Sequence, residues 1–460
     1  MSARAKTLLG NLRLCTADGI AAVPVCYLVL PSNFIVAALL VTRFKLPPEV
    51  YGVICSMPFW GNFTQAFVMP FFNRRLLPKT IAMSAAVVQT LCWAVMAVAI
   101  GFLPGDRPGV SSPWFLGFFA VSALASAMSG VSWTSWVQEW VPRRVRGKYF
   151  GLRNRLLQVT QVVFLLGVGW LLTASGGSVR AFQVLIGVSV VLRVVSVYSQ
   201  FRTVAGTGPA RAEAKFPWRD QFATLAATTP FKWFIAYGAV WGFAANFFGP
   251  FYPVFMIEEL GCSLGKVSFL IVLTSVGGVL SYPAWGALGD RFGNKPVMLF
   301  AMIAWQLQNF CWFFLTPANV WMLYGMWIFG GIMNAGFTLS LFNIQLKIIP
   351  PAAKTLAISL NLAVTALITA VAPILGGWVL QTLLARGLPA LRVYHLLVLV
   401  QPVLALLGCL LLVRVYEVNA RPLSSVVGAM RNIRTLSAML GLGFFVDHIF
   451  YKPAKKAGRN

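Results

Sequence analysis

Long apolar runs recur along most of the chain and restrict what it can fold into. The runs are about 20 residues long, which at 1.5 Å per residue lets a helix cross a hydrocarbon core of about 30 Å. Hydrophobic residues make up 58% of the 460-residue sequence and charged residues only 10%, against roughly 25% charged in a soluble domain. The runs do not alternate with a period of two, which disfavours a transmembrane β-barrel. We therefore predict an all-α protein with several membrane-spanning helices.

The order of the apolar runs predicts twelve spans in two groups of six. They are expected at residues 17–42, 50–72, 80–103, 113–138, 151–174, 180–202, 230–256, 267–288, 296–316, 320–346, 354–384 and 392–416. Between the groups, the sequence is rich in Gly, Pro, Ala and charge, as is typical of a linker. We therefore predict four parts: an N-terminal six-helix bundle (1–202), a cytoplasmic linker (203–229), a C-terminal six-helix bundle (230–416) and a basic cytoplasmic tail (417–460).

The formal net charge is +26, but the basic residues do not form one patch. Lys and Arg concentrate in alternate connections between the predicted spans, which is how a membrane protein records its orientation. A nucleic-acid partner is therefore not expected. The asymmetry places both termini, the linker and the connection after the fourth span on the cytoplasmic side of a plasma or bacterial inner membrane. In the tail, the apolar stretch 439–451 is too short to span and is interpreted as an interfacial segment.

One loop carries a recognisable motif. Residues 286–295, between the eighth and ninth predicted spans, read Gly-Ala-Leu-Gly-Asp-Arg-Phe-Gly-Asn-Lys. This resembles the G-x-x-x-D-R-x-G-x-K/R loop of the major facilitator superfamily, which is best known between the second and third spans and often echoed between the eighth and ninth. The glycines allow a sharp turn and close helix approach. In the first half the acid is replaced by Asn73, and Met69 and Leu76 stand at glycine positions.

A second resemblance follows the fourth predicted span, where Pro142 precedes Arg146, Gly147 and Gly151. Superfamily members often carry a Pro, then Arg-Gly, then another Gly at the start of the fifth span. Pro142 ends one helix, and the glycines allow the chain to begin the next. The resemblance implies two six-helix bundles related by a pseudo-two-fold axis along the membrane normal. It also implies a transporter that works by alternating access.

The same resemblance suggests how one side could be gated. In the superfamily the eighth span packs near the fifth across the interface between the bundles, so Asp290 is expected to face the basic start of the fifth span. Our hypothesis is that this contact latches the cytoplasmic side shut. The alternative is a static loop charge that only helps to set topology. The gating residues expected from the motifs are Gly286, Asp290, Arg291, Gly293, Lys295, Arg146 and Arg153.

Charged residues inside the predicted spans are few. Arg193, in the middle of the sixth, could bind an anionic substrate, pair with an acid or snorkel. Asp18, at the start of the first, is interpreted as a capping or surface residue rather than a proton-coupling one. Amide and aromatic side chains are frequent and should face the bundle interior. Because spans 1, 4, 7 and 10 usually line the cavity in the superfamily, the expected substrate contacts, together with Arg193, are Asn33, Trp133, Trp136, Asn246 and Asn334.

These features predict a secondary active or facilitative transporter that moves a small organic solute, uncharged or amphiphilic, across the bilayer as a monomer. A non-transport role on the same scaffold, such as pigment or lipid delivery or assembly of a membrane complex, is the alternative. Catalysis is not expected, since no large loop presents paired carboxylates, a metal cluster or a nucleophile with its base. We expect neither a cofactor nor a metal, and the seven cysteines are interpreted as small packing residues.

Overall fold

The computed structural model describes residues 3–73, 75–204, 218–349, 354–417 and 420–431, which are almost entirely helical and contain no strand. The predicted interfacial segment at 439–451 lies outside these residues. The first half of the chain forms six long helices: α1 (Ala3–Leu28), α3 (Pro48–Asn73), α4 (Pro78–Ala99), α5 (Pro108–Trp140), α6 (Arg143–Ala174) and α7 (Val179–Arg202). Proline stands in the first turn of α4 and α5. The N–H groups of a first turn have no partner within the helix, so the N–H that proline lacks costs no helical hydrogen bond.

The second half repeats this pattern. Its long helices are α9 (Thr229–Phe247), α11 (Leu264–Phe292), α12 (Asn294–Asn309), α13 (Met322–Ile348), α14 (Lys354–Ala385) and the consecutive pair α15 (Ala390–Val398) and α16 (Val400–Val413). Two short helices, α8 (Trp218–Ala227) and α17 (Leu423–Arg431), precede and follow this half. Gly293 makes the turn between α11 and α12 with a φ of 94°, a conformation that glycine adopts without a steric penalty.

Ten of the described helical segments are long and apolar enough to cross a bilayer. The two other predicted spans correspond to α1 and α3, each 26 residues long, and the count of twelve stays a prediction. The predicted bounds of the first span were wrong, because α1 begins at Ala3 and ends at Leu28. Asn33 then caps a separate segment, α2 (Phe34–Ala37), which continues into the π-helical η1 (Ala38–Arg43). Both pieces are apolar, so hydropathy alone could not separate them.

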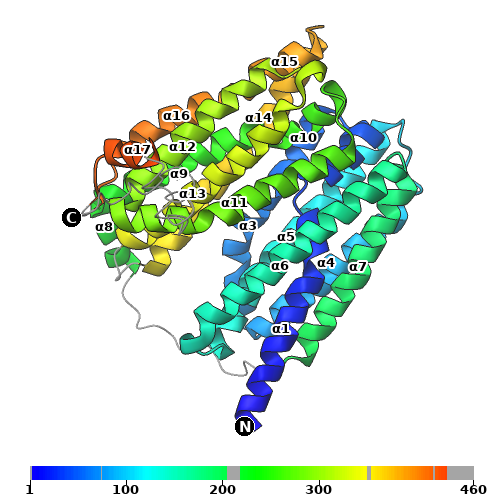
Figure 1. Cartoon of the computed structure of the whole chain (residues 1–460). Helices are drawn as coiled ribbons and strands as arrows, with labels where there is room; N and C mark the ends of the chain where they lie inside the picture. The colour runs from blue at the N-terminus through cyan, green and yellow to red at the C-terminus, as the bar shows by residue number, and fades with distance from the viewer. Residues whose placement is uncertain (1–2, 74, 205–217, 350–353, 418–419, 432–460) are drawn as a thin grey trace, which may run out of the picture.

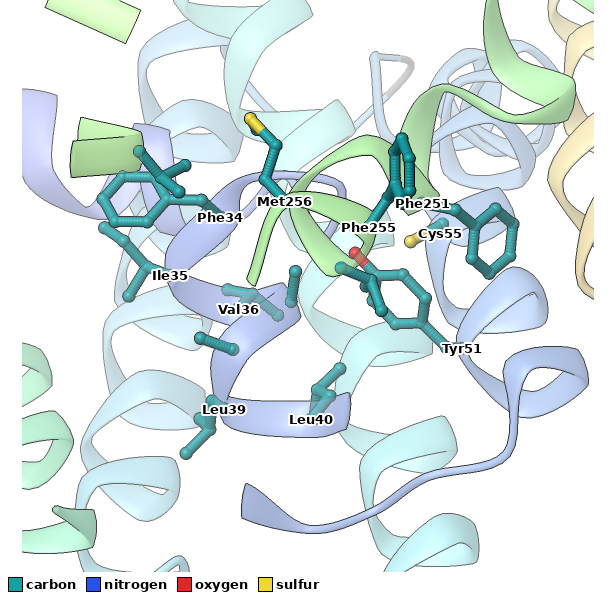
Figure 2. Close-up of a cluster of buried hydrophobic side chains, with 14 of the residues drawn as sticks. Phe34, Ile35, Val36, Leu39, Leu40, Tyr51, Cys55, Phe251, Phe255 and Met256 are labelled. Atoms are coloured by element: carbon teal, nitrogen blue, oxygen red, sulfur yellow. The ribbon is translucent and has the colours of Figure 1, made fainter. Parts of the chain in front are cut away.

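The two halves lie side by side, meet at one end and diverge toward the other (Figure 1). The diverging end carries the start of α1, α8 and α17, and we call it the basic end. At the opposite end, α2 and η1 of the first half pack against α10 (Tyr252–Val254) of the second, which lies in the chain between η2 (Gly249–Phe251) and η3 (Phe255–Glu259). Figure 2 shows the side chains that meet there, and we call them the apolar seal: Phe34, Val36, Leu39, Leu40, Tyr51, Phe251, Phe255 and Met256.

The apolar seal excludes water almost completely, since each of its side chains is at most 2% exposed. Its one polar group is the hydroxyl of Tyr51, which lies 3.0 Å from the carbonyl oxygen of Pro31 and 3.2 Å from that of Pro250. Pro31 belongs to the first half and Pro250 to the second, so this hydroxyl joins the halves. The pairing satisfies a buried donor that would otherwise be costly.

Close backbone approach continues the contact beside the seal. A Cβ atom at Gly52 of α3 would overlap the carbonyl oxygen of Pro373 in α14, and one at Gly377 would overlap that of Pro48. On the other side of the interface, the Ser268 hydroxyl of α11 donates to the Leu165 carbonyl of α6 at 2.6 Å. Glycines therefore permit the halves to touch at the end opposite the basic end.

We expect Gly52→Ala to weaken this closure, because the added methyl group cannot be accommodated without separating α3 from α14. Overpacking of this kind typically costs about 1–3 kcal/mol, enough to shift a two-state equilibrium by roughly tenfold. Spin labels at the exposed positions Leu152 on α6 and Phe342 on α13 would report the distance between the basic ends. That distance should shorten as the opposite end opens.

Gly167→Ala is the matched control, since a Cβ atom at Gly167 of α6 would meet nothing within 4 Å. It should leave the label distances unchanged. A Gly52→Ala protein with the same distance distribution as the wild type would show that this contact does not hold the closed end.

Candidate functional site

A cavity of about 310 Å³ lies between the two halves, beside the apolar seal. One wall comes from the end of α1 and the start of α2. The other comes from η2, α10, α11, α12, α13 and α16. Most of the lining side chains are aromatic or carry an amide: Tyr27, Asn33, Tyr252, Trp305, Gln308, Asn309, Trp312, Trp327, Asn334 and Gln401. None of the described residues that line this central cavity is charged.

Two polar groups in the lining have no hydrogen-bond partner among the described residues: the indole N–H of Trp327 and the hydroxyl of Tyr252. The Tyr252 ring packs against that of Trp312, with the ring centroids 4.6 Å apart. Buried donors without partners are rare and cost free energy, so they favour a ligand that accepts hydrogen bonds. Aromatic faces beside a few polar groups are typical of sites that bind small organic molecules.

Two of the predicted substrate contacts line the central cavity, Asn33 and Asn334. The Asn33 amide already has structural partners. Its oxygen accepts from the backbone N–H groups of Ile35 and Val36, and its nitrogen donates to the Tyr27 carbonyl at 2.9 Å. Asn33 therefore fixes the turn that begins α2, and Asn334 on α13 is the better placed of the two for a ligand.

The other predicted contacts lie elsewhere. The Asn246 amide donates to the Gly242 carbonyl within its own helix at 2.9 Å. Trp136 is 2% exposed and packs with Cys15 and Val137 in the core of the first half. Trp133 and Arg193 line a second cavity inside the first half. The structure therefore does not bring these four side chains to the central cavity.

The aromatic and amide face of α12 was not predicted as part of the site. This face and the turn after it contribute Trp305, Gln308, Asn309 and Trp312 to the central cavity. The superfamily pattern directed attention to spans 1, 4, 7 and 10 instead. A signal was present, since the first three of these residues have the i, i+3, i+4 spacing of neighbours on one helix face. Gln401 on α16 was also missed, and it is a lone amide in an apolar run.

The interpretation of Asp18 as a capping or surface residue was wrong. Its side chain is 3% exposed, because α1 begins at Ala3 and places it well inside the helix. One carboxylate oxygen accepts from the Ser196 hydroxyl at 2.6 Å and the Gln200 amide at 2.9 Å. The other accepts from the Trp133 indole N–H at 3.0 Å. Asp18 is thus a buried acceptor that links α1 to α5 and α7.

Comparison with known proteins agrees with this arrangement of two helical halves around a cavity. The sequence profile of the Major Facilitator Superfamily matches residues 25–264 and 237–451, which together cover most of the chain. The chain belongs to the Major Facilitator Superfamily. The predicted superfamily fold, all-α with two helical halves, is confirmed.

Individual superfamily relatives are distant. The proline/betaine transporter of Salmonella typhimurium (strain LT2) is 26% identical over 196 residues, which is 41% of this chain and 36% of that protein. The chain therefore aligns with about a third of that relative's length. Among solved structures, the nucleoside transporter NupG has a TM-score of 0.65 at 14% identity, with 88% of this chain and 98% of that chain covered.

Two further superfamily structures share the fold. A bacterial homologue of the human lysosomal transporter Spinster has a TM-score of 0.61 at 16% identity, with 97% of this chain and 99% of that chain covered. A D-xylose–proton symporter has a TM-score of 0.62 at 12% identity, with 86% and 97% covered. At such identities the likeness shows the fold alone.

The superfamily loop lies at the basic end. Asp290 and Arg291 are exposed there, and Arg291 stacks over the Phe292 ring with 5.2 Å from its Cζ to the ring centroid. The expected partners of Asp290 are engaged elsewhere in this conformation. Arg146 donates to the Gln138 and Val141 carbonyls, whereas Arg153 is buried inside the first half. The latch between Asp290 and α6 therefore stays a hypothesis about a different conformation.

A carboxylate that the motif did not predict organises the superfamily loop. Glu417, which follows α16, accepts from the backbone N–H groups of Asn294 and Lys295 at 3.1 and 2.6 Å. It also pairs with Lys347 at 2.8 Å. The Glu417 carboxylate therefore caps the first turn of α12, where the helix dipole favours a negative charge. A Cβ atom at Gly293 would lie 3.0 Å from the Cα of Ala420, so the loop packs directly against Ala420.

This network gives a pH-dependent prediction. Burial alone would raise the pKa of Glu417, but its hydrogen bonds from Lys347, Lys295 and Asn294 outweigh burial and lower that pKa below its ordinary value. A carboxyl whose pKa is lower in the folded state stabilises the protein above its unfolded pKa of about 4.3. We expect this stabilisation to be lost as the pH falls through the folded pKa.

Glu417→Gln should therefore lower the free energy of unfolding at pH 7 by about 1–3 kcal/mol, the usual range for hydrogen bonds to a charged group. The midpoint of thermal unfolding, measured in detergent from pH 7 to pH 3.5, should fall less steeply with pH in the variant. Glu49→Gln changes an exposed carboxylate at the opposite end and is the control. Parallel pH profiles for Glu417→Gln and the wild type would contradict the assignment.

Proposed function

We propose that the chain is a secondary active or facilitative transporter, which carries a small organic solute through the central cavity by alternating access. The observation that supports this most directly is the position of the central cavity, between two halves that the apolar seal joins at only one end. A ligand in such a place is reached from the diverging end. Opening of the seal and closure of the basic end would then present the same cavity to the other side.

The proposed orientation follows from charge. Lys and Arg cluster in the connections at the basic end, and by the positive-inside rule this end is cytoplasmic. Both described ends of the chain, the start of α1 and α17, lie there (Figure 1). The conformation described above is then open to the cytoplasm and closed on the outside. We propose that the protein works in this orientation as a monomer in a plasma or bacterial inner membrane, and that it catalyses no reaction.

The central cavity favours a solute without net charge. An ionised group without a partner in a low-dielectric cavity is strongly disfavoured, and the described lining offers aromatic and aliphatic side chains, amides and hydroxyls but no charged group. The names of three of the similar proteins described above mention proline, betaine, nucleosides and D-xylose, and each of these solutes is uncharged or zwitterionic. They form the first panel of candidate substrates.

Uptake into proteoliposomes that contain the purified protein would test this proposal. We expect saturable uptake of at least one solute of the panel. Asn334→Ala should raise the KM of that solute about fivefold, which corresponds to the loss of one hydrogen bond of about 1 kcal/mol. Asn246→Ala is the matched control, since the Asn246 amide bonds to its own helix. Binding of a solute without flux would instead favour a non-transport role on the same scaffold.

The latch hypothesis applies to the outward-open conformation of this transporter. If Asp290 holds the basic end shut by pairing with α6, Asp290→Asn should favour the conformation with that end open. The distance between labels at Leu152 and Phe342 should then lengthen, opposite to the change expected for Gly52→Ala. An unchanged distance in both the presence and the absence of transported solute would leave Asp290 as a loop charge that sets topology.

A further inference from the structure

A second cavity, of about 240 Å³, lies inside the first half, among α1, α4, α5, α6 and α7. None of its lining residues belongs to the central cavity. It shares Ser126 and Gly130 with a neighbouring hollow of about 500 Å³, which is lined by Val29 and Leu30 after α1 and by residues of α3 and α5. The two spaces are therefore neighbours.

Two buried arginines line the second cavity, and their hydrogen-bonding capacity is mostly unused. Arg193 is 5% exposed and Arg153 is 8% exposed. Arg193 donates through Nη1 to the Ser196 hydroxyl at 3.0 Å, while its Nε has no partner among the described residues. Arg153 donates through Nε to the Cys15 carbonyl at 3.2 Å and stacks over the ring of Trp133. A guanidinium carries five N–H donors, so both side chains can bind an additional acceptor.

The carboxylate of Asp18 does not neutralise both arginines. Neutral donors from Ser196, Gln200 and Trp133 occupy its two oxygens. Within the described part of the chain, the one ion pair with its charged atoms within 4.0 Å of each other is that of Lys347 and Glu417, at the basic end. Neither arginine forms such a pair with Asp18. Two guanidinium groups and one carboxylate leave a net charge of +1 on the lining of the second cavity. A buried charge without a counterion is costly, and a bound anion would remove that cost.

The orientation of Gln200 narrows the choice of anion. Its amide nitrogen faces Asp18, because an ionised carboxylate can only accept hydrogen bonds. Its amide oxygen is therefore directed elsewhere, and it is buried without a partner among the residues that the structure describes. A ligand that satisfies both groups must offer a negative charge to the arginines and an O–H or N–H donor to Gln200. A halide ion offers no such donor.

We propose that the second cavity binds a small carboxylate that also carries a hydroxyl or amino group. Its carboxylate lies between Arg153 and Arg193, since guanidinium groups recognise carboxylates through paired hydrogen bonds. Its hydroxyl or amino hydrogen points to the oxygen of Gln200. Asp18 fixes Gln200 and Ser196 and does not itself contact the ligand. This site is separate from the central cavity, so binding here and solute uptake there can fail independently.

Ligand-dependent thermal unfolding of the purified full chain in detergent tests the proposal. The probes are sodium lactate, sodium acetate, sodium chloride and the uncharged ester methyl lactate. Lactate should raise the unfolding midpoint in a saturable way, acetate should do so at higher concentration, and chloride and methyl lactate should not. No variant is needed for this comparison. Equal effects of chloride and lactate, or of methyl lactate and lactate, would overturn the proposal.

Two substitutions predict effects of opposite sign. Arg193→Gln should weaken lactate binding at least tenfold, because it removes the charge that attracts the carboxylate. Asp18→Asn should strengthen lactate binding several-fold, because it removes a nearby negative charge. Weaker lactate binding by Asp18→Asn than by the wild type would contradict this role for Asp18.

Arg202→Gln is the matched control, since Arg202 is an exposed arginine on the same helix α7. It should bind lactate as the wild type does. Without ligand, Arg193→Gln should be at least as stable as the wild type, because it removes an uncompensated buried charge. A lower midpoint for Arg193→Gln, together with unchanged lactate binding in any folded fraction, would show that Arg193 serves only the fold.

Discussion

The two halves of this chain come closest where glycines let one backbone touch another. At Gly52 and Gly377, the space that a side chain would need is taken by a carbonyl oxygen of the other half. In lipid there is little hydrophobic drive for helices to associate, so such van der Waals contact matters more than it does in water. The apolar seal can form only because α3 and α14 approach this closely. The central cavity in turn depends on the seal, which closes one end of it.

Neutral polar side chains and buried charged side chains lie in different halves of the molecule. The second half supplies most of the neutral aromatic and amide lining of the central cavity. The first half keeps its buried charges, Asp18, Arg153 and Arg193, within its own helices. Because the charges do not face the central cavity, the proposed alternating access would not require them to be desolvated anew. This division would let the halves move without breaking the buried polar network of the first half.

Much of the fold could be predicted from the sequence, because apolar runs, basic connections and the loop at Asp290 are local signals. The site was predicted less well, for reasons that particular residues show. Asn246 and Trp136 are in helices of the expected type, but neither α9 nor α5 contributes a residue to the described lining of the central cavity. Asp18 was misplaced because the start of α1 is polar and hydropathy begins the span too late. Such errors concern the position of each helix relative to the cavity and the true helix ends, which a hydropathy window does not report.

Glu417 illustrates a contact that sequence could not reveal, since it joins residues more than a hundred positions apart. It also has a consequence for how the protein is made. The first half has all its helices by Arg202, whereas the start of α12 lacks its carboxylate until Glu417 has been synthesised. At about 5–20 residues per second, these two points are separated by roughly 10–40 s. By the end of that interval, a finished first half shares the membrane with a second half whose superfamily loop is still unsupported.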